Sequence, residues 1–312
     1  MKEKRIIAID TDPGIDDALA IMLAASCPEI EISAILPVNG NVSLEYTTRD
    51  ALQIKKLLGL HSRIGIGAEK PLKALNRCHT AAIHGGGMAG CSIETDEVPE
   101  NKACQDILME EASEWAGRLD LIALAPLTNV AEALIQYPVL KQKIRSIMIM
   151  GGSAAEGNIT PFAEFNSWTD PEACDIVLRS GIPIRICGLD GLQSAALNDA
   201  EMQEFMGYGG KIGSIAGQMI SFLKDHSHGW GEHSGVVIYD LVTMACYLHP
   251  EIGKFRPALI RCVTGDVPEA GKTVVEYTDN TGKQPNAEIL VSCNKEAYKA
   301  LFKEALQKLS LR

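Results

Sequence analysis

The chain has 312 residues, of which 46% are hydrophobic, and its 29 Lys and Arg against 40 Asp and Glu give a net charge of −11. That apolar content supports a large folded core and excludes a disordered chain. The negative charge argues against nucleic acid or an anionic membrane as the main partner, and no apolar run is long enough to cross a bilayer.

Short apolar runs alternate with helical periodicity through the first two thirds of the chain. The runs typical of strands are 5–10, 31–38, 120–125, 145–151 and 182–188. The helical stretches that follow them are 18–26, 44–58, 104–116, 130–137 and 172–180. Strands that alternate with helices pair in parallel, so the sequence predicts an α/β fold with a mostly parallel, Rossmann-like central sheet flanked by helices.

The pattern changes after residue 198. Consecutive helices are predicted at 199–206, 211–225 and 236–248, and a β-rich tail follows at 258–264, 272–278 and 288–294 before a last helix from Lys295. No repeat, low-complexity segment or Ser/Gly linker interrupts the chain, so we expect a single domain over residues 1–312. Two long Gly-rich loops, 69–100 and 151–169, have a length that is often functional in compact domains.

The nine cysteines are scattered and include no Cys-x-x-Cys pair. An odd number cannot pair completely, and the spacing does not match a zinc site, so we expect free and mostly buried thiols. Such thiols are typical of a reducing compartment. The N-terminal segment also lacks the apolar length and cleavage site of a secretory signal, so the sequence predicts a cytoplasmic protein.

Four carboxylates follow the first predicted strand in the segment DTDPGIDDA: Asp10, Asp12, Asp16 and Asp17. Open parallel sheets bind ligands beyond the carboxyl ends of their strands, where Pro13-Gly14 forces a tight turn. Helix capping explains one or two carboxylates at a helix start, but four in one turn repel one another. A hard divalent cation such as Ca²⁺, which binds carboxylate and carbonyl oxygens, would offset that repulsion.

Six blocks of sequence resemble, in the expected order, the nucleoside hydrolases of the inosine–uridine-preferring type. They are DTDPGIDDALA (10–20), VNGN (38–41), IHGGG (83–87), APLTNVAEAL (125–134), EGNITPFAEFNSWTDPEA (156–173) and YDLVTMACYLHP (239–250). The resemblance implies hydrolysis of the N-glycosidic bond of ribonucleosides to ribose and free base, in purine or pyrimidine salvage. It also implies a homodimer or homotetramer, because members of this family commonly form both.

The resemblance assigns roles to individual residues. The implied ligands of one Ca²⁺ per subunit are Asp12, Asp17, Asp240 and the backbone carbonyl of Thr128. Asp12 would also accept the proton of the attacking water. The residues implied to hold ribose are Asp16 and Asn166 at the 2′- and 3′-hydroxyls, Asn158 and Glu164 at the 5′-hydroxyl, and Asn41 beside the sugar. Asp10 would support the turn, and His84 would lie by the base or at the mouth of the pocket.

The reaction explains why these residue types are needed. Cleavage of an N-glycosidic bond passes through an oxocarbenium-like transition state, which requires a water on one face and a stabilised leaving group on the other. A divalent cation orients that water and lowers its pKa, and a carboxylate beside it accepts the proton. Contacts to several ribose hydroxyls supply binding energy that can distort the sugar, so we expect 2′-deoxynucleosides to be rejected.

Ordinary structural roles stay open for several of these residues. Asp240 begins a predicted helix, and N-capping alone would account for an Asp there. His84 lies among glycines, where an exposed loop histidine is common. Glu164 and Asn166 are two residues apart, so they share one side only if that segment is extended.

One position departs from the family pattern. Many members carry a His immediately before the last metal-binding Asp, where this chain has Tyr239. Tyrosine is a hydrogen-bond donor at neutral pH, but its ordinary pKa of about 10 makes it a weak acid. The nearby segment 225–235 supplies other candidates, namely His226, His228, His233 and Trp230. We expect Tyr239 or one of these histidines, such as His228, to assist departure of the base while Trp230 packs on it; a solvated loop is the alternative.

Two other functions stay open. A Ca²⁺-dependent ribonucleoside-binding protein without turnover is possible because Tyr239 replaces the usual acid. A phosphohydrolase of the haloacid-dehalogenase type also begins with Asp-x-Asp after its first strand. Pro13-Gly14 does not fit that pattern, however, and the segment GLDG (188–191) offers only one carboxylate of the later acidic pair that binds Mg²⁺.

Overall fold

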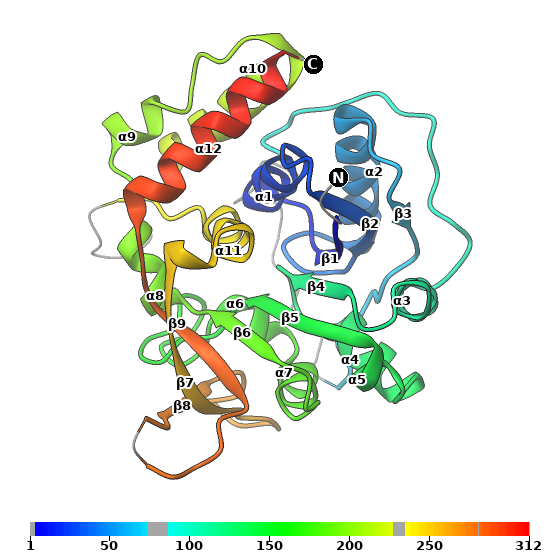
Figure 1. The fold of residues 1–312 in the computed structure, drawn as a ribbon, viewed down its shortest axis with the longest axis vertical. Coiled ribbons are helices and arrows are strands. Elements are labelled where there is room, and N and C mark those ends of the chain that lie inside the picture. Colours follow the sequence, from blue (N-terminus) through cyan, green and yellow to red (C-terminus); the bar gives the residue numbers. More distant parts are fainter. Residues whose placement is uncertain (1–3, 74–86, 227–234, 280, 312) are drawn as a thin grey trace.

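The computed structural model describes residues 4–73, 87–226, 235–279 and 281–311. All strands in these residues join one nine-stranded sheet in the order β3-β2-β1-β4-β5-β6-β9-β7-β8 (Figure 1). Their bounds are β1 Arg5–Thr11, β2 Ile30–Pro37, β3 Arg63–Ile64, β4 Leu119–Ala123, β5 Ile144–Met150, β6 Ile184–Cys187, β7 Gly253–Cys262, β8 Thr273–Tyr277 and β9 Ala287–Cys293.

The sheet is parallel from β3 through β9, and only β7 runs antiparallel to its neighbours β9 and β8. The order β3-β2-β1-β4-β5-β6 is that of a Rossmann-type sheet, whose strand order reverses beside β1. The prediction of a mostly parallel α/β sheet is therefore confirmed. The predicted β-rich tail extends the same sheet, because β9 returns alongside β6, and this continuity supports the expectation of one domain.

Helices cover both faces of the sheet. Their bounds are α1 Ile15–Ala25, α2 Leu44–Leu58, α3 Cys104–Glu114, α4 Thr128–Gln136, α5 Leu140–Lys143, α6 Phe165–Thr169, α7 Pro171–Leu178, α8 Leu189–Leu192, α9 Asp199–Gln203, α10 Gly210–His226, α11 Tyr239–Leu248 and α12 Lys295–Ser310. In Figure 1, α1, α10, α11 and α12 lie above the sheet, while α3, α4, α5 and α7 lie below it.

Two apolar cores, one on each face, explain the strand sequences. Along β1, Ile7 and Ile9 contribute to the core shared with α1 and α11, while Ile6 and Ala8 contribute to the core shared with α3 and α4. Successive side chains of a strand point to opposite faces. A strand that is buried on both faces therefore reads as the continuous apolar run RIIAI rather than as an alternation.

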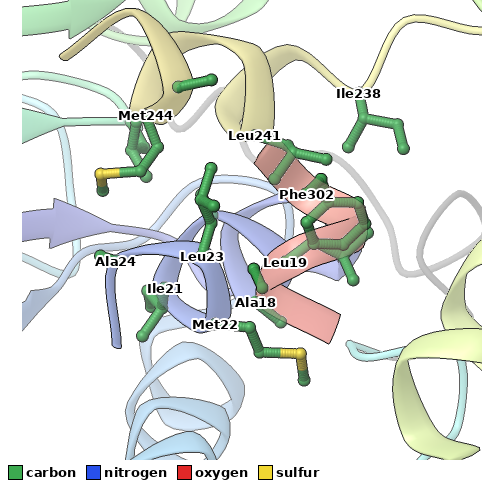
Figure 2. Close-up of a cluster of buried hydrophobic side chains, with 14 of the residues drawn as sticks. Ala18, Leu19, Ile21, Met22, Leu23, Ala24, Ile238, Leu241, Met244 and Phe302 are labelled. Atoms are coloured by element: carbon green, nitrogen blue, oxygen red, sulfur yellow. The ribbon is translucent and has the colours of Figure 1, made fainter. Parts of the chain in front are cut away.

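Helix α1 packs against α11 and α12 on the upper face. Leu19 and Leu23 of α1 lie in one cluster with Leu241 and Met244 of α11 and with Phe302 of α12 (Figure 2). This packing matters for function because both α1 and α11 carry aspartates in their first turns.

The structure differs from the sequence prediction at some element boundaries. Helix α1 begins at Ile15 rather than at residue 18, because the Asp17 carboxylate accepts a hydrogen bond from the backbone N–H of Gly14 and closes the first turn. The predicted loop 151–169 ends in the short helix α6. Glu164 caps this helix by accepting hydrogen bonds from the backbone N–H groups of Asn166 and Ser167.

The eight cysteines in the described part of the chain are free thiols, as predicted. Five of them are buried: Cys104, Cys174, Cys187, Cys246 and Cys262.

Among the residues described, no helix combines the length and the apolar character that crossing a membrane requires.

Candidate active site

The predicted site residues follow the carboxyl ends of adjacent parallel strands. Asp12 comes directly after β1, Asn41 lies in the turn after β2, and Thr128 begins the helix that follows β4. Glu164 and Asn166 lie on the connection that follows β5. Because β2, β1, β4 and β5 are neighbours in the sheet, these turns meet at one edge, where ligands of such sheets bind.

Three aspartates from α1 and α11 form an acidic cluster at this edge. Oxygen atoms of Asp16, Asp17 and Asp240 all lie within 4.8 Å of one another. Asp17 also accepts hydrogen bonds from the Thr11 hydroxyl and, at 3.1 Å, from the backbone N–H of Gly14. The α1–α11 packing thus brings together carboxylates that are more than 220 residues apart in the chain.

Asp12 lies close to this cluster, and the charges of Asp17 and Asp16 both act on its carboxyl. Its side chain is 1% exposed, and its Oδ2 accepts a 2.6 Å hydrogen bond from the backbone N–H of Asn41. A Cβ at Gly40 would lie 2.1 Å from that same Oδ2, so only glycine lets the backbone approach the carboxylate. The VNGN block therefore acts on Asp12 through its main chain, while the predicted contact of the Asn41 side chain with ribose stays a prediction.

Burial raises the pKa of the carboxyls of Asp12, Asp16 and Asp240. The nearby charge of Asp17 adds to the effect at Asp12, and that of Asp16 adds to it at Asp240. Oδ1 of Asp240 is buried and accepts no hydrogen bond from any described residue. Buried carboxylates this close are costly unless a cation compensates them, so this set of oxygens fits a hard divalent cation.

Asp10 lies beneath the acidic turn and is held by Asn129. The amide nitrogen of Asn129 donates to Oδ1 of Asp10 at 2.8 Å and to the carbonyl of Pro37 at 3.0 Å, and its amide oxygen accepts from the backbone N–H of Ala68 at 2.8 Å. Burial raises the pKa of Asp10 to about 7. Asn129 is not among the predicted site residues, and its only signal in the sequence is its position beside Thr128.

Thr128 directs its side chain away from the acidic cluster. Its hydroxyl donates to Oδ2 of Asp170 at 2.7 Å, and Asp170 also caps α7 through the backbone N–H of Ala173. The hydroxyl is thereby engaged, which leaves the backbone carbonyl as the group of Thr128 that could reach a metal. That ligand role stays a prediction.

The predicted ribose residues near β5 are anchored by the backbone. Oε2 of Glu164 accepts from the N–H of Gly152 at 2.8 Å, and its pKa is raised by burial. The amide nitrogen of Asn166 donates to the carbonyls of Leu124 and Met150, at the ends of β4 and β5. The amide oxygen of Asn166 is therefore the atom suited to accept a hydrogen bond from a ribose hydroxyl.

Asn158 lies on the exposed loop between β5 and α6, where its Oδ1 accepts from the backbone N–H of Phe165 at 2.9 Å. This hydrogen bond closes the loop against the start of α6. A contact of Asn158 with the 5′-hydroxyl stays a prediction.

Tyr239 is the first residue of α11 and lies close to two site carboxylates. Burial raises its pKa to about 12, and the charges of Asp16 and Glu164 contribute to that shift. The phenol therefore stays protonated at neutral pH and can donate a hydrogen bond. Its two neighbouring charges come from the acidic cluster and from a predicted ribose residue.

The predicted histidine candidates are only partly described by the structure. His226 ends α10, where its ring stacks on Phe222 with a centroid distance of 3.9 Å and its Nδ1 lies 2.9 Å from the Phe222 carbonyl. The other candidates of this group lie outside the described residues, namely His84, His228, His233 and Trp230. Their roles stay predictions.

Comparisons with known proteins agree with this geometry. The family model of the inosine-uridine preferring nucleoside hydrolases matches residues 7–300. The pyrimidine-specific ribonucleoside hydrolase RihA of Salmonella typhimurium is 36% identical over 306 residues, which cover 96% of this chain and 98% of that protein. The non-specific ribonucleoside hydrolase RihC of Escherichia coli O127:H6 is 37% identical over 309 residues, with 96% and 97% covered.

Solved structures show the same likeness. A purine-preferring ribonucleoside hydrolase from Gardnerella vaginalis superposes with a TM-score of 0.90 at 26% identity and covers 98% of this chain and 100% of its own. The plant nucleoside hydrolase PpNRh1 gives a TM-score of 0.89 at 25% identity, with 97% and 99% covered. With a family model that spans nearly the whole sequence and relatives that match it end to end, the chain belongs to the inosine-uridine preferring nucleoside hydrolase family.

Proposed function

We propose that this chain hydrolyses the N-glycosidic bond of ribonucleosides and releases ribose and the free base. The observation that carries the proposal is the cluster of Asp16, Asp17 and Asp240, of which the last two are buried, at the ligand-binding edge of a nucleoside hydrolase fold. The relatives named above include pyrimidine-specific, non-specific and purine-preferring hydrolases. The substrate class common to them is the ribonucleoside, and it is this class that we propose.

We propose Ca²⁺ as the cofactor, one ion per subunit, bound by Asp12, Asp17, Asp240 and the backbone carbonyl of Thr128. The support is the cluster of carboxylate oxygens from Asp16, Asp17 and Asp240, which includes a buried Asp240 oxygen that no described residue satisfies. Asp12 and Thr128 are added as ligands from the family resemblance, which assigns Asp16 to ribose instead. When bound, the ion supplies orientation of the attacking water and lowers the pKa of that water.

Asp12 acts as the base that accepts the proton of the attacking water. The N–H of Asn41 holds Oδ2 of Asp12, so the carboxylate has a defined orientation before the substrate enters. Asp16 and the amide oxygen of Asn166 hold the 2′- and 3′-hydroxyls. Glu164, together with Asn158, meets the 5′-hydroxyl. These contacts align the anomeric carbon with the water and supply binding energy for distortion of the sugar.

Tyr239 stabilises the departing base by donating a hydrogen bond from its phenol. A pKa of about 12 makes the phenol a donor rather than a source of a mobile proton at neutral pH. His228 is retained as a second leaving-group candidate, with His84 and Trp230 beside the base. We also retain a homodimer or homotetramer, a cytoplasmic location and a role in nucleoside salvage as proposals from the family resemblance.

A reducing-sugar assay across purine and pyrimidine ribonucleosides tests the function. We expect ribose release by the purified protein, its loss after unfolding and refolding in EDTA, and its recovery on addition of CaCl₂. Unfolding in EDTA is included because a buried ion can resist chelation of the folded protein. Tight ribonucleoside binding without ribose release would instead support a binding protein. Phosphate release from phosphomonoesters without ribose release would support the phosphohydrolase.

A further inference from the structure

The connection from β5 to α6 carries both residues proposed for the 5′-hydroxyl. Backbone hydrogen bonds from Gly157 to Pro161 and from Ile159 to Ala163 hold its later part, whereas the residues just after Ser153 have little packing. Ala154, Ala155, Glu156 and Asn158 are exposed. A segment with so few buried contacts takes its order from the anchors at its ends. The anchor at the α6 end is the hydrogen bond between Asn158 and the N–H of Phe165.

Ser153 forms the anchor at the β5 end and is 3% exposed. Its backbone N–H donates to Oγ1 of Thr273 at 2.8 Å, and its carbonyl accepts from the same hydroxyl at 2.7 Å. Its own hydroxyl donates to Oδ2 of Asp190 at 2.9 Å, and that oxygen also accepts from the N–H of Ala154 at 2.6 Å. Thr273 thus holds the backbone of Ser153, and Asp190 holds its side chain.

Both partners reach Ser153 from other strands of the sheet. Asp190 lies in α8, directly after β6, and Thr273 is the first residue of β8. Gly152 makes the approach of Thr273 possible, because a Cβ there would lie 2.9 Å from the threonine hydroxyl and the glycine has a φ of +72°. The N–H of Leu189 also donates to the Gly152 carbonyl at 3.0 Å.

The same segment holds the carboxylate of Glu164. The N–H of Gly152 donates to Oε2 of Glu164 at 2.8 Å, so the residue beside Ser153 contacts one proposed 5′-hydroxyl ligand directly. Asn158 follows Ser153 by five residues along the exposed loop. A shift of Ser153 would therefore disturb the hydrogen bond from Gly152 to Glu164 and the start of the loop that carries Asn158.

We propose that Asp190 and Thr273 are positioning residues that fix the ribose 5′-hydroxyl subsite through Ser153 and Gly152. The inference rests on the proposed function. It assigns a role to Asp190, the carboxylate of the GLDG segment, which is neither a proposed metal ligand nor a proposed ribose contact. Neither residue needs to touch the substrate, since each acts on the loop that does.

The test compares uridine and inosine with their 5′-deoxy counterparts in the Asp190→Ala and Thr273→Val variants. We expect each variant to lower kcat/KM for uridine and inosine by about tenfold, because the loop loses a hydrogen bond that holds it and is displaced. The 5′-deoxy substrates have no group for this subsite, so their kcat/KM stays within about twofold of wild type. Asp190→Asn, which keeps an acceptor oxygen, is expected to retain most of the activity.

Asp106→Ala is the matched control. Asp106 of α3 also accepts two hydrogen bonds, from the Tyr137 hydroxyl at 2.5 Å and from the Gln136 amide at 3.2 Å, but it lies on the opposite face of the sheet. We expect it to leave both substrate series unchanged. Ser153→Ala removes the hydroxyl, which donates to Asp190 and accepts from the N–H of Ala155, and leaves the Thr273 contacts with the backbone in place. It should give the same selective loss at smaller size if the larger changes prevent folding.

The outcomes separate the inference from the proposed function. Equal losses on natural and 5′-deoxy substrates would overturn the positioning role and leave ribonucleoside hydrolysis intact. Unchanged kinetics in Asp190→Ala, Thr273→Val and Ser153→Ala would overturn the positioning role as well. A wild-type protein that hydrolyses neither uridine nor inosine would instead contradict the proposed function, and the inference with it.

Discussion

At the scale of single residues, burial controls the chemistry of the site. The pKa values of Asp12, Asp16 and Asp240 are raised because water is excluded from their carboxyls. The proposed cation would reverse that effect and keep Asp12, the proposed base, ionised at neutral pH. Burial also raises the pKa of Tyr239, so its phenol stays protonated and remains a hydrogen-bond donor at neutral pH.

Replacement of Tyr239 by Phe tests the leaving-group role. We expect kcat for inosine and uridine to fall by about tenfold or more, because the departing base loses a hydrogen bond in the transition state. Turnover of p-nitrophenyl riboside should stay within about twofold, since its leaving group needs no such help. Steady-state kinetics on both substrates measure the difference.

Tyr247→Phe is the control on the same helix. Its hydroxyl donates to Oδ2 of Asp120 at 2.7 Å, so the change removes a partly buried tyrosine hydrogen bond without touching the site. We expect no change in the ratio of the two activities. If Tyr239→Phe also leaves that ratio unchanged, Tyr239 does not assist the base, and the histidines of segment 225–235 should be replaced in turn.

At the scale of secondary-structure elements, the contact between α1 and α11 sets the spacing of the acidic cluster. Leu241 lies one residue after Asp240 and packs among the α1 side chains (Figure 2). Leu241→Ala should lower the free energy of unfolding by about 2–5 kcal/mol, as for other buried leucines. It should also weaken Ca²⁺ binding, because α11 can then shift relative to α1. Isothermal titration of the metal-free protein measures that affinity.

Leu108→Ala provides the comparison on the opposite face. Leu108 of α3 is 1% exposed and belongs to the other core, so its truncation should cost similar stability. We expect its Ca²⁺ affinity to match that of wild type. Equal weakening of Ca²⁺ binding in both variants would show that the metal site responds to global stability rather than to the α1–α11 contact.

Glu201 links two other elements, the short helix α9 and the C-terminal helix α12. Partial burial raises its pKa, but ion pairs with Lys295 and Lys299 and a hydrogen bond from the N–H of Asn198 outweigh this and leave the pKa at about 2. A carboxyl with a lowered folded-state pKa stabilises the fold above its unfolded pKa of about 4.3 and loses that contribution as the pH falls toward 2.

Glu201→Gln should therefore lower the free energy of unfolding near neutral pH. The difference in that free energy between the variant and wild type should shrink below about pH 4. Urea unfolding midpoints between pH 3 and pH 7 measure it. Glu276→Gln is the control, because Glu276 of β8 makes an exposed ion pair with Lys283 on the connection between β8 and β9. A Glu201 difference that does not change with pH would contradict the assignment.

At the scale of the whole molecule, the proposed metal site would couple ion binding to stability. An ion that binds only the folded state stabilises it by about 2.7 kcal/mol at one hundred times its dissociation constant. Without the ion, the raised pKa values of the site carboxyls mean that the folded state holds more protons than the unfolded state. Stability of the metal-free protein should then fall as the pH rises above the ordinary aspartate range.

Thermal unfolding with EDTA and with CaCl₂ between pH 5 and pH 8 tests this expectation. The melting temperature should fall with pH in EDTA, stay nearly level in Ca²⁺, and differ most at pH 8. Asp240→Asn removes one of the crowded carboxylates, so it should reduce both the pH dependence and the response to Ca²⁺. A Ca²⁺ response as large in that variant as in wild type would place the ion elsewhere.

Some of these features follow from residues that are close together in the chain. The first five predicted strands and most helices match the structure within a few residues, because apolar periodicity and turn residues are local signals. Element ends were less certain wherever a side chain decided them. The start of α1 depends on Asp17, and the existence of α6 depends on the cap provided by Glu164.

The contacts that build the site could not be predicted in the same way. Asn129 holds Asp10 from 119 residues away, and Thr273 holds Ser153 from 120 residues away. Neither residue carries a local pattern that distinguishes it from an ordinary polar residue at the start of a helix or strand. Their partners are set by which strands become neighbours in the sheet.

Three features could be read from short stretches of consecutive residues: the alternating α/β pattern, the acidic turn of Asp10 to Asp17, and the family resemblance. That resemblance also implied that Asp17 and Asp240 share one metal ion. The addition of Asp16 to their cluster, and the meeting of Asp190 and Thr273 at Ser153, are seen only in the folded structure. The physical reason is that these contacts arise from burial of helix and strand faces against one another, and that packing joins segments that no local pattern connects.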